Sequence, residues 1–161
     1  MRKFFLLLFC FSTFTIALYA QKQQPYHPDA NASQDINNAI LEAKAAHKFV
    51  LLQGGGNWCK WCLEFYRFCK ADKTIDSIIN RNFVWYHLNY SKENKNESVF
   101  KMYEYPQRFG FPVFIVLNQD GKRIHTQNSE YLEDGKSSYD KNKVISFLEM
   151  WSPDALDAKK Y

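Results

Sequence analysis

The chain has 161 residues, 46% of them hydrophobic, which is enough to bury the core of one domain but not of several. Its 21 basic residues are scattered among 17 acidic ones, so it lacks the basic stripe typical of nucleic-acid-binding domains. We therefore expect a single globular domain that does not bind nucleic acid.

The chain begins with the features of a secretory signal peptide. Arg2 and Lys3 precede an apolar run over residues 4–18, and Ala20 is the small residue expected before a cleavage point. The run is short for a membrane-spanning helix, which needs about 20 apolar residues. We expect a signal peptide over residues 1–20, with an uncleaved anchor as the alternative. Cleavage would give a periplasmic or secreted protein without a membrane attachment.

The first part of the mature chain predicts a helix, a buried strand and a turn. Residues 21–32 form an irregular lead-in that contains two prolines. Ser33 is the expected N-cap of a helix that extends to His47, because apolar residues recur behind it at helical spacing. Residues 49–53 are a short apolar run, typical of a strand buried on both faces. The glycines at 54–56 are expected to form a flexible turn.

The rest of the chain continues the alternation of helices and strands. The pattern predicts helices at 59–70 and from a cap at Thr74, a strand at 83–89, a short helix around 99–103, strands at 113–117 and 122–126, and a helix at 140–151. We therefore expect one α/β domain over residues 33–152, followed by a C-terminal tail at 153–161.

Two cysteines three residues apart, Cys59 and Cys62, lie where the second helix is expected to begin. There the unpaired N–H groups and the helix dipole favour the thiolate, which can lower a thiol pKa from about 8.5 toward 7. Residues three apart on a helix also have a separation that suits a disulfide. The pair therefore predicts redox chemistry, with a fixed structural disulfide and half of a zinc site as alternatives.

The other cysteines are not expected to take part. Cys10 lies in the expected signal peptide. Cys69 would lie about 10.5 Å beyond Cys62 along an intact helix, which exceeds the roughly 7 Å limit for a disulfide. We expect Cys69 to be a small buried residue. No second cysteine pair is present to complete a four-ligand zinc site, and we predict no metal.

Several motifs together resemble the thioredoxin superfamily. They are Trp58-Cys59-Lys60-Trp61-Cys62 after a buried strand, Phe111-Pro112 before a later strand, and Asp120-Gly121 at a hairpin. The first motif resembles the secreted bacterial thioredoxin-like proteins with a Trp-Cys-x-Trp-Cys site. The resemblance implies a thioredoxin-like fold, in which a central mixed β-sheet lies between two helical layers.

The resemblance also implies a role for each site residue. Cys59 would be the exposed nucleophile, and Cys62 the thiol that resolves the mixed disulfide. Pro112 would be a cis-proline facing the pair, with Phe111 lending backbone hydrogen bonds to a bound substrate. Trp58 and Trp61 would offer an apolar rim to an extended partner, although one of the two is expected to pack in the core.

Two departures from the family pattern concern the redox potential. Thioredoxins commonly carry a buried Asp six residues before the first cysteine, whereas this chain has Gln53, which cannot take up a proton near neutral pH. Glu64 is the nearest carboxylate and is expected to be a surface charge. The dipeptide between the cysteines is Lys60-Trp61 rather than Gly-Pro. Three of the four histidines are expected to be structural or surface residues: His47, His87 and His125.

The sequence thus predicts a protein-disulfide reductase that works outside the cytosol without a metal or organic cofactor. Its partners would be protein disulfide or dithiol substrates and a redox donor protein, and the enzyme would be a monomer. A disulfide oxidase or isomerase is the first alternative, since a compartment that favours disulfides can use either. The second is a non-catalytic binding or chaperone-like module with a structural Cys59–Cys62 disulfide.

Overall fold

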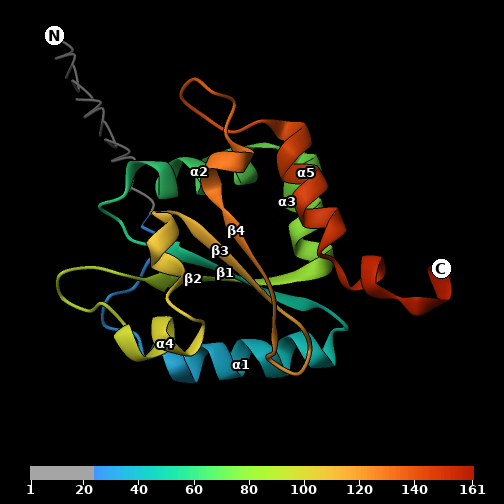
Figure 1. The fold of residues 1–161 in the computed structure, drawn as a ribbon, viewed down its shortest axis with the longest axis horizontal. Coiled ribbons are helices and arrows are strands. Elements are labelled where there is room, and N and C mark those ends of the chain that lie inside the picture. Colours follow the sequence, from blue (N-terminus) through green and yellow to red (C-terminus); the bar gives the residue numbers. More distant parts are fainter. Residues whose placement is uncertain (1–23) are drawn as a thin grey trace, which may run out of the picture.

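A computed structural model describes residues 24–161, so the expected signal peptide lies outside the described residues. Its centre is a four-stranded sheet with the strand order β2-β1-β3-β4 (Figure 1). Strand β1 (Phe49–Gly55) pairs in parallel with β2 (Phe83–Asn89) and antiparallel with β3 (Val113–Leu117). The edge strand β4 (Arg123–Asn128) pairs antiparallel with β3. Every residue of β1 and β3 is buried, which accounts for their continuous apolar runs.

Helices cover both faces of this sheet and give three layers (Figure 1). One face carries α1 (Ala32–Ala45) and α4 (Glu97–Met102). The opposite face carries α2 (Lys60–Ala71), α3 (Lys73–Asn82) and α5 (Lys141–Met150). Neighbouring residues of a strand enter opposite clusters, as the alternation of side chains along a strand requires. The expected three-layer α/β/α arrangement around a mixed sheet is therefore present.

Short 3-10 turns complete the chain. They are η1 (Pro106–Phe109), η2 (Ser129–Leu132), η3 (Pro153–Leu156) and η4 (Ala158–Lys160). The last two lie in the expected tail beyond α5. No helix within residues 24–161 is long and apolar enough to cross a bilayer.

Two expected helix caps were wrong. The cap of α1 is Asn31, whose side chain accepts a hydrogen bond from Gln34 N at 3.2 Å, rather than Ser33. The cap of α3 is Asp72, which accepts from the backbone N–H groups of residues 74 and 75, rather than Thr74. Asn and Asp rank at least as high as Ser and Thr at this position. Local pattern therefore located both helices and missed their first residues.

The expected flexible turn at residues 54–56 was also wrong for its first two glycines, which end strand β1. A Cβ on Gly54 would lie 3.0 Å from Val113 Cγ1. A Cβ on Gly55 would lie 2.4 Å from Cys62 Sγ and 2.9 Å from the Tyr26 hydroxyl oxygen. These glycines are therefore needed for the close approach of neighbouring side chains rather than for a turn.

Candidate active site

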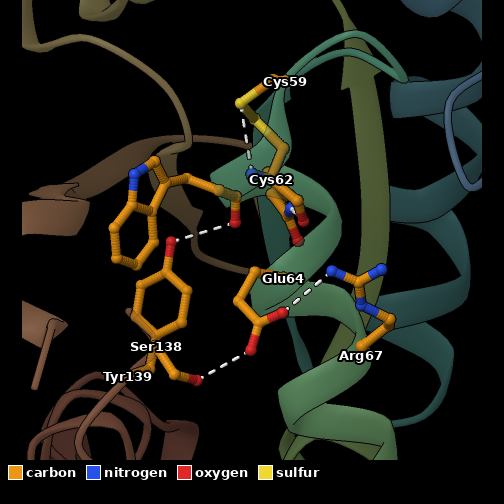
Figure 2. A network of polar contacts seen from close by, with 8 residues as sticks. Cys59, Cys62, Glu64, Arg67, Ser138 and Tyr139 are labelled. Atoms are coloured by element: carbon orange, nitrogen blue, oxygen red, sulfur yellow. Dashed lines mark hydrogen bonds and ion pairs between the residues drawn. A yellow bond between two sulfur atoms is a disulfide. The ribbon is translucent and has the colours of Figure 1, made fainter. Parts of the chain in front are cut away.

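The two cysteines of the predicted redox pair form a disulfide at the N-terminus of α2 (Figure 2). Their Cα atoms are 5.2 Å apart. Cys59 is the N-cap of α2, and its sulfur accepts a hydrogen bond from Cys62 N at 3.2 Å. Cys59 retains 6% of its accessible surface and Cys62 retains none. Both cysteines are therefore largely buried, and of the two only Cys59 retains surface that a partner can contact.

The Phe111–Pro112 segment lies beside this pair, although the two motifs are about fifty residues apart in the sequence. The peptide bond between the two residues is cis, as the resemblance implied. Phe111 packs against the cluster formed by Tyr26, Cys59 and Cys62. The fold thus brings together both sequence motifs that were expected to form the site.

The two tryptophans have different surroundings, as expected. Trp58 is 60% exposed, its indole N–H donates to Tyr90 O at 2.6 Å, and its ring meets Phe111 edge to face at 5.7 Å. Trp61 is half-buried and packs edge to face on Tyr139 at 5.6 Å. Trp58 is therefore the more exposed of the two tryptophans that neighbour Cys59.

A cavity of about 520 Å³ opens next to Trp58. Trp58 and Tyr90 form part of its wall, together with Asn57 and Asn89, and Lys92 and Glu93 also line it. It is large enough for one or more side chains of a bound chain. Sequence reasoning named Trp58 but missed Tyr90, which follows β2 in a polar loop without a motif of its own.

Gln53 faces Cys62, as expected from its position in the sequence. The Gln53 side chain is fully buried, and its Nε2 donates to Cys62 O at 3.0 Å and to the Tyr26 hydroxyl at 2.7 Å. Its Oε1 has no hydrogen-bond partner among the described residues. A neutral amide therefore occupies the place next to the inner cysteine.

Tyr26 is the site residue that sequence reasoning missed. It is 1% exposed, although it belongs to the lead-in that was expected to be irregular. Two hydrogen bonds tie its backbone to Asn57: Asn57 Nδ2 donates to Tyr26 O at 2.7 Å, and Tyr26 N donates to Asn57 Oδ1 at 3.3 Å. Burial raises the pKa of Tyr26 well above its usual value, while the hydrogen bond from Gln53 has a smaller effect in the opposite direction.

Glu64 does not contact the cysteines. Its carboxylate accepts hydrogen bonds from Arg67 Nη2 at 2.9 Å and from Ser138 Oγ at 2.8 Å (Figure 2). The neighbouring Tyr139 donates its hydroxyl to the Trp61 carbonyl at 3.1 Å. The loop before α5 is thus attached to the first turns of α2 and supports the site from one side.

Cys69, His87 and His125 pack within the structure and His47 is exposed, so their surroundings are those expected of structural or surface residues. Cys69 is a free thiol in the core, and burial raises its pKa well above the usual value. Burial, with smaller effects of nearby positive groups, lowers the pKa of His87 to about 3. His125 stacks on Trp151 at 3.9 Å. Within residues 24–161, no three His, Cys, Asp or Glu side chains are grouped as metal ligands would be.

Comparison with known proteins agrees with this geometry. A family model described as a thioredoxin-like domain matches residues 36–132, more than half of the chain. No curated protein sequence matches significantly.

Solved structures with a similar fold include three bacterial proteins. A disulphide isomerase from Xylella fastidiosa Temecula1 is 24% identical, with a TM-score of 0.69 over 79% of this chain and 95% of its own. The oxidised C-terminal domain of Neisseria meningitidis DsbD is 17% identical, with a TM-score of 0.56 over 76% and 97%. A Thermus thermophilus thioredoxin is 15% identical, with a TM-score of 0.50 over 71% and 81%. At these identities the similarity shows a shared fold.

Proposed function

The chain belongs to the thioredoxin-like domain family. We propose that it is a protein-disulfide reductase that acts outside the cytosol. The observation that carries the proposal is the unequal exposure of a disulfide at a helix N-terminus. Cys59 caps α2 and retains some surface, whereas Cys62 is fully covered. This arrangement separates an attacking thiol from a resolving thiol.

The reaction proceeds by two exchanges of sulfur partners. The Cys59 thiolate attacks a disulfide of the partner protein, forms a mixed disulfide and releases the first partner sulfur as a thiolate, which takes a proton from water. Cys62 then loses its proton and attacks Cys59 Sγ, which forms the Cys59–Cys62 bond and releases the second partner thiol. Two electrons pass to the partner, and a donor dithiol returns the pair to its reduced form by the same exchange.

The hydrogen bonding around Cys59 supports reduction as the direction. Among the described residues, the hydrogen bond that Cys59 Sγ accepts comes from Cys62 N alone. Oxidants of this fold owe their high potential to a strongly stabilised reduced form. A Cys59 thiolate that keeps this single donor after reduction is stabilised less than one with several donors, which favours the disulfide form of the pair and a reducing potential.

The surface beside Cys59 supports a protein as the substrate. Trp58 is exposed, contacts Phe111 and lines the cavity of about 520 Å³. An exposed aromatic ring next to a cavity suits the apolar side chains of an extended or unfolded segment. We propose that the monomer binds such a segment across Trp58 and Phe111, with Pro112 facing the reacting sulfur.

Two measurements test the direction and the class of function. Insulin reduction with a thiol donor reports turnover, and equilibration with glutathione buffers reports the potential. A potential near the roughly −270 mV of thioredoxin supports a reductase, whereas one near the roughly −120 mV of DsbA indicates an oxidase. Absence of turnover in every redox buffer would favour a non-catalytic module with a structural disulfide.

The proposed location rests on the basic and apolar residues of the N-terminal segment, with Ala20 at its end. We expect protein exported by its native host to begin near Gln21. N-terminal sequencing checks this directly, and a membrane-held chain that still begins at Met1 would contradict it.

A further inference from the structure

We propose that Tyr26 is the hydrogen-bond donor that stabilises the thiolate of Cys62 in the resolving step, with Gln53 holding the hydroxyl in place. The inference rests on the proposed function, because it concerns the thiol that the function assigns to resolution. It adds a residue from the lead-in to the site and gives the Gln53 amide a role.

Gly55 lies next to both the Tyr26 hydroxyl and the Cys62 sulfur. The place where a Cβ would stand on this glycine is 2.4 Å from Cys62 Sγ and 2.9 Å from the Tyr26 hydroxyl oxygen. Both atoms therefore lie beside Gly55 of β1, and no side chain at this position separates them. Tyr26 and the two cysteines also form one buried cluster, from which water is largely excluded.

The hydrogen bonds of Gln53 fix the direction of the Tyr26 hydroxyl. A carbonyl only accepts, so the group that faces Cys62 O at 3.0 Å must be the amide NH₂. Its second N–H donates to the Tyr26 oxygen at 2.7 Å. Within the described part of the chain, the hydroxyl proton itself has no acceptor, so it is free to turn toward the Cys62 sulfur when that sulfur becomes an anion.

Tyr26 acts as a donor and not as a base. Burial raises its pKa well above the usual value, so the phenol stays protonated at physiological pH. Gln53 has no titratable proton, and neither side chain can therefore accept the proton of Cys62. That proton leaves to solvent, and the neutral phenol stabilises the anion left behind by a charge-assisted hydrogen bond.

Two other titratable groups near the pair, His87 and Tyr139, have pKa values shifted by burial, and a third, Glu64, is bonded elsewhere. His87 on β2 meets Tyr26 edge to face at 5.3 Å and is neutral, because its pKa is lowered to about 3. Burial raises the pKa of Tyr139, which approaches from the loop before α5. The carboxylate of Glu64 on α2 is bonded to Arg67 and Ser138.

Two charged or titratable residues act on His87 in turn, His27 of the lead-in and Lys70 of α2, and both lower its pKa by less than burial does. Neither residue contacts Cys62 in the described structure. The pH dependence of resolution should therefore report the thiol of Cys62 itself.

Tyr26→Phe removes the hydroxyl and keeps the ring. Loss of a hydrogen bond to a charged group should raise the pKa of the Cys62 thiol by about one unit. The thiolate population then falls about tenfold at low pH, but a more basic thiolate is intrinsically more reactive, with a Brønsted coefficient of about 0.4–0.5. The two effects combine to make resolution about threefold slower below both pKa values and up to about threefold faster above both.

The two releases of thionitrobenzoate from Ellman's reagent separate attack from resolution. Reduced protein first forms a mixed disulfide at Cys59 and releases one equivalent. Cys62 then closes the protein disulfide and releases the second. We would follow both phases by stopped flow from about pH 6 to about pH 10 in wild type, Tyr26→Phe and Gln53→Met. The last variant keeps the length of the side chain and removes the amide that holds the hydroxyl.

Tyr86→Phe is the matched control. This variant also loses a hydroxyl that makes a hydrogen bond, because the Tyr86 hydroxyl donates to Asp35 Oδ2 at 3.2 Å. Tyr86, however, lies on the face of the sheet that α1 covers. Its second phase should equal that of wild type at every pH. The first phase should be the same in all four proteins, since neither Tyr26 nor Gln53 makes a described hydrogen bond to Cys59.

The expected result is a crossing of the wild-type and Tyr26→Phe profiles in the second phase, with a smaller shift in the same direction for Gln53→Met. If Tyr26→Phe does not fold, the Gln53→Met shift decides. Superimposed profiles of wild type and Tyr26→Phe would overturn the proposal. A slowing of Tyr26→Phe by one constant factor at every pH would also overturn it, because it would show a purely structural role for the hydroxyl. If wild type lacks a second release, the reductase mechanism fails instead, so the two failures are distinguishable.

Discussion

Gln53 shows how one side chain sets the chemistry of the inner cysteine. Thioredoxins commonly place a carboxylate at this position, which can exchange a proton with the second thiol. Here a buried amide donates two hydrogen bonds and holds both Cys62 O and the Tyr26 hydroxyl. Where thioredoxins commonly have a carboxylate that accepts a proton, this chain has an amide that donates two hydrogen bonds. The proton of Cys62 must leave without a neighbouring base.

Gln53→Glu should destabilise the protein in a pH-dependent manner. Burial raises the pKa of such a carboxyl above its ordinary value of about 4.3. Below about pH 4 it is neutral in both states, and the variant should be close to wild type. As the pH rises, the unfolded state ionises first, and stability is lost until the pH exceeds the folded pKa. The loss should be on the order of a few kcal/mol.

Urea unfolding at about pH 4 and about pH 8 measures this difference in the free energy of unfolding. An equal deficit at both values would mean that the new carboxyl is solvated or paired. In the thionitrobenzoate assay, the same variant should alter the second release and leave the first unchanged. A changed first release would show that Gln53 also influences Cys59.

Trp58→Ala should weaken action on proteins more than action on small disulfides. The ring is 60% exposed and stands between Phe111 and the cavity, so its loss removes a contact with the bound chain and little of the core. We expect kcat/KM for insulin to fall about tenfold, as for a tryptophan that anchors an interface. The rate with Ellman's reagent should remain near wild type.

Leu41→Ala is the control for this experiment, since Leu41 is 67% exposed on α1, away from the cysteines. It should leave both rates unchanged. Equal losses on both substrates for Trp58→Ala would place the tryptophan in the chemistry of Cys59 and not in substrate binding.

Among the elements, two of the four strands have the expected bounds, whereas β1 extends to Gly55 rather than residue 53 and β4 spans Arg123–Asn128 rather than residues 122–126. The bounds of β2 and β3 are those expected, because β3 is a continuous apolar run and β2 is rich in aromatic and aliphatic residues that favour a strand. The end of β1 was missed, because Gly54 and Gly55 locally indicate a turn. Their reason lies in side chains from distant elements, such as Val113 and Cys62. No local pattern contains that information.

Asp72 connects three helices. It ends α2, caps α3 and forms an ion pair with Lys141 of α5 at 2.7 Å. The hydrogen bond from Lys141, followed by that from Ile75 N, lowers its pKa. A lowered folded pKa gives stability above the unfolded value of about 3.9, which is lost as the pH falls through the folded pKa.

Asp72→Asn keeps a good cap and removes the charge. Its melting temperature at about pH 7 should be a few degrees below that of wild type. The two should converge as the pH falls from about 3.9, where the unfolded chain is protonated, through the lower folded pKa, where folded wild type also loses the charge. Lys141→Met should cause a similar loss without touching the cap. A difference that persists unchanged at low pH would assign the effect to the cap and not to the ion pair.

At the scale of the whole molecule, the sequence predicted the cysteine pair and the neighbouring proline segment, because both are short motifs. It did not predict that the lead-in closes over the site. Tyr26 contacts Asn57, 31 residues away, and Asn94 Nδ2 reaches Pro28 O at 2.9 Å across 66 residues. Such contacts follow from the tertiary arrangement of unrelated loops. Neither hydrophobic periodicity nor a spacing rule indicates them.

Trapping of exported protein tests whether Cys59 attacks the partner disulfide and Cys62 resolves the mixed disulfide. Cys62→Ser cannot resolve the mixed disulfide, because serine is too weak a nucleophile, so partner proteins should accumulate on Cys59. Cys59→Ser should trap almost nothing, because Cys62 is fully buried. Cys69→Ala should leave both results unchanged, since that thiol is enclosed in the core. Non-reducing gels, with mass spectrometry of the partners released by dithiothreitol, provide the measurement. We predict abundant complexes for Cys62→Ser alone. Equal trapping by both serine variants, or none by either, would contradict the assignment of Cys59 as the attacking thiol and Cys62 as the resolving thiol.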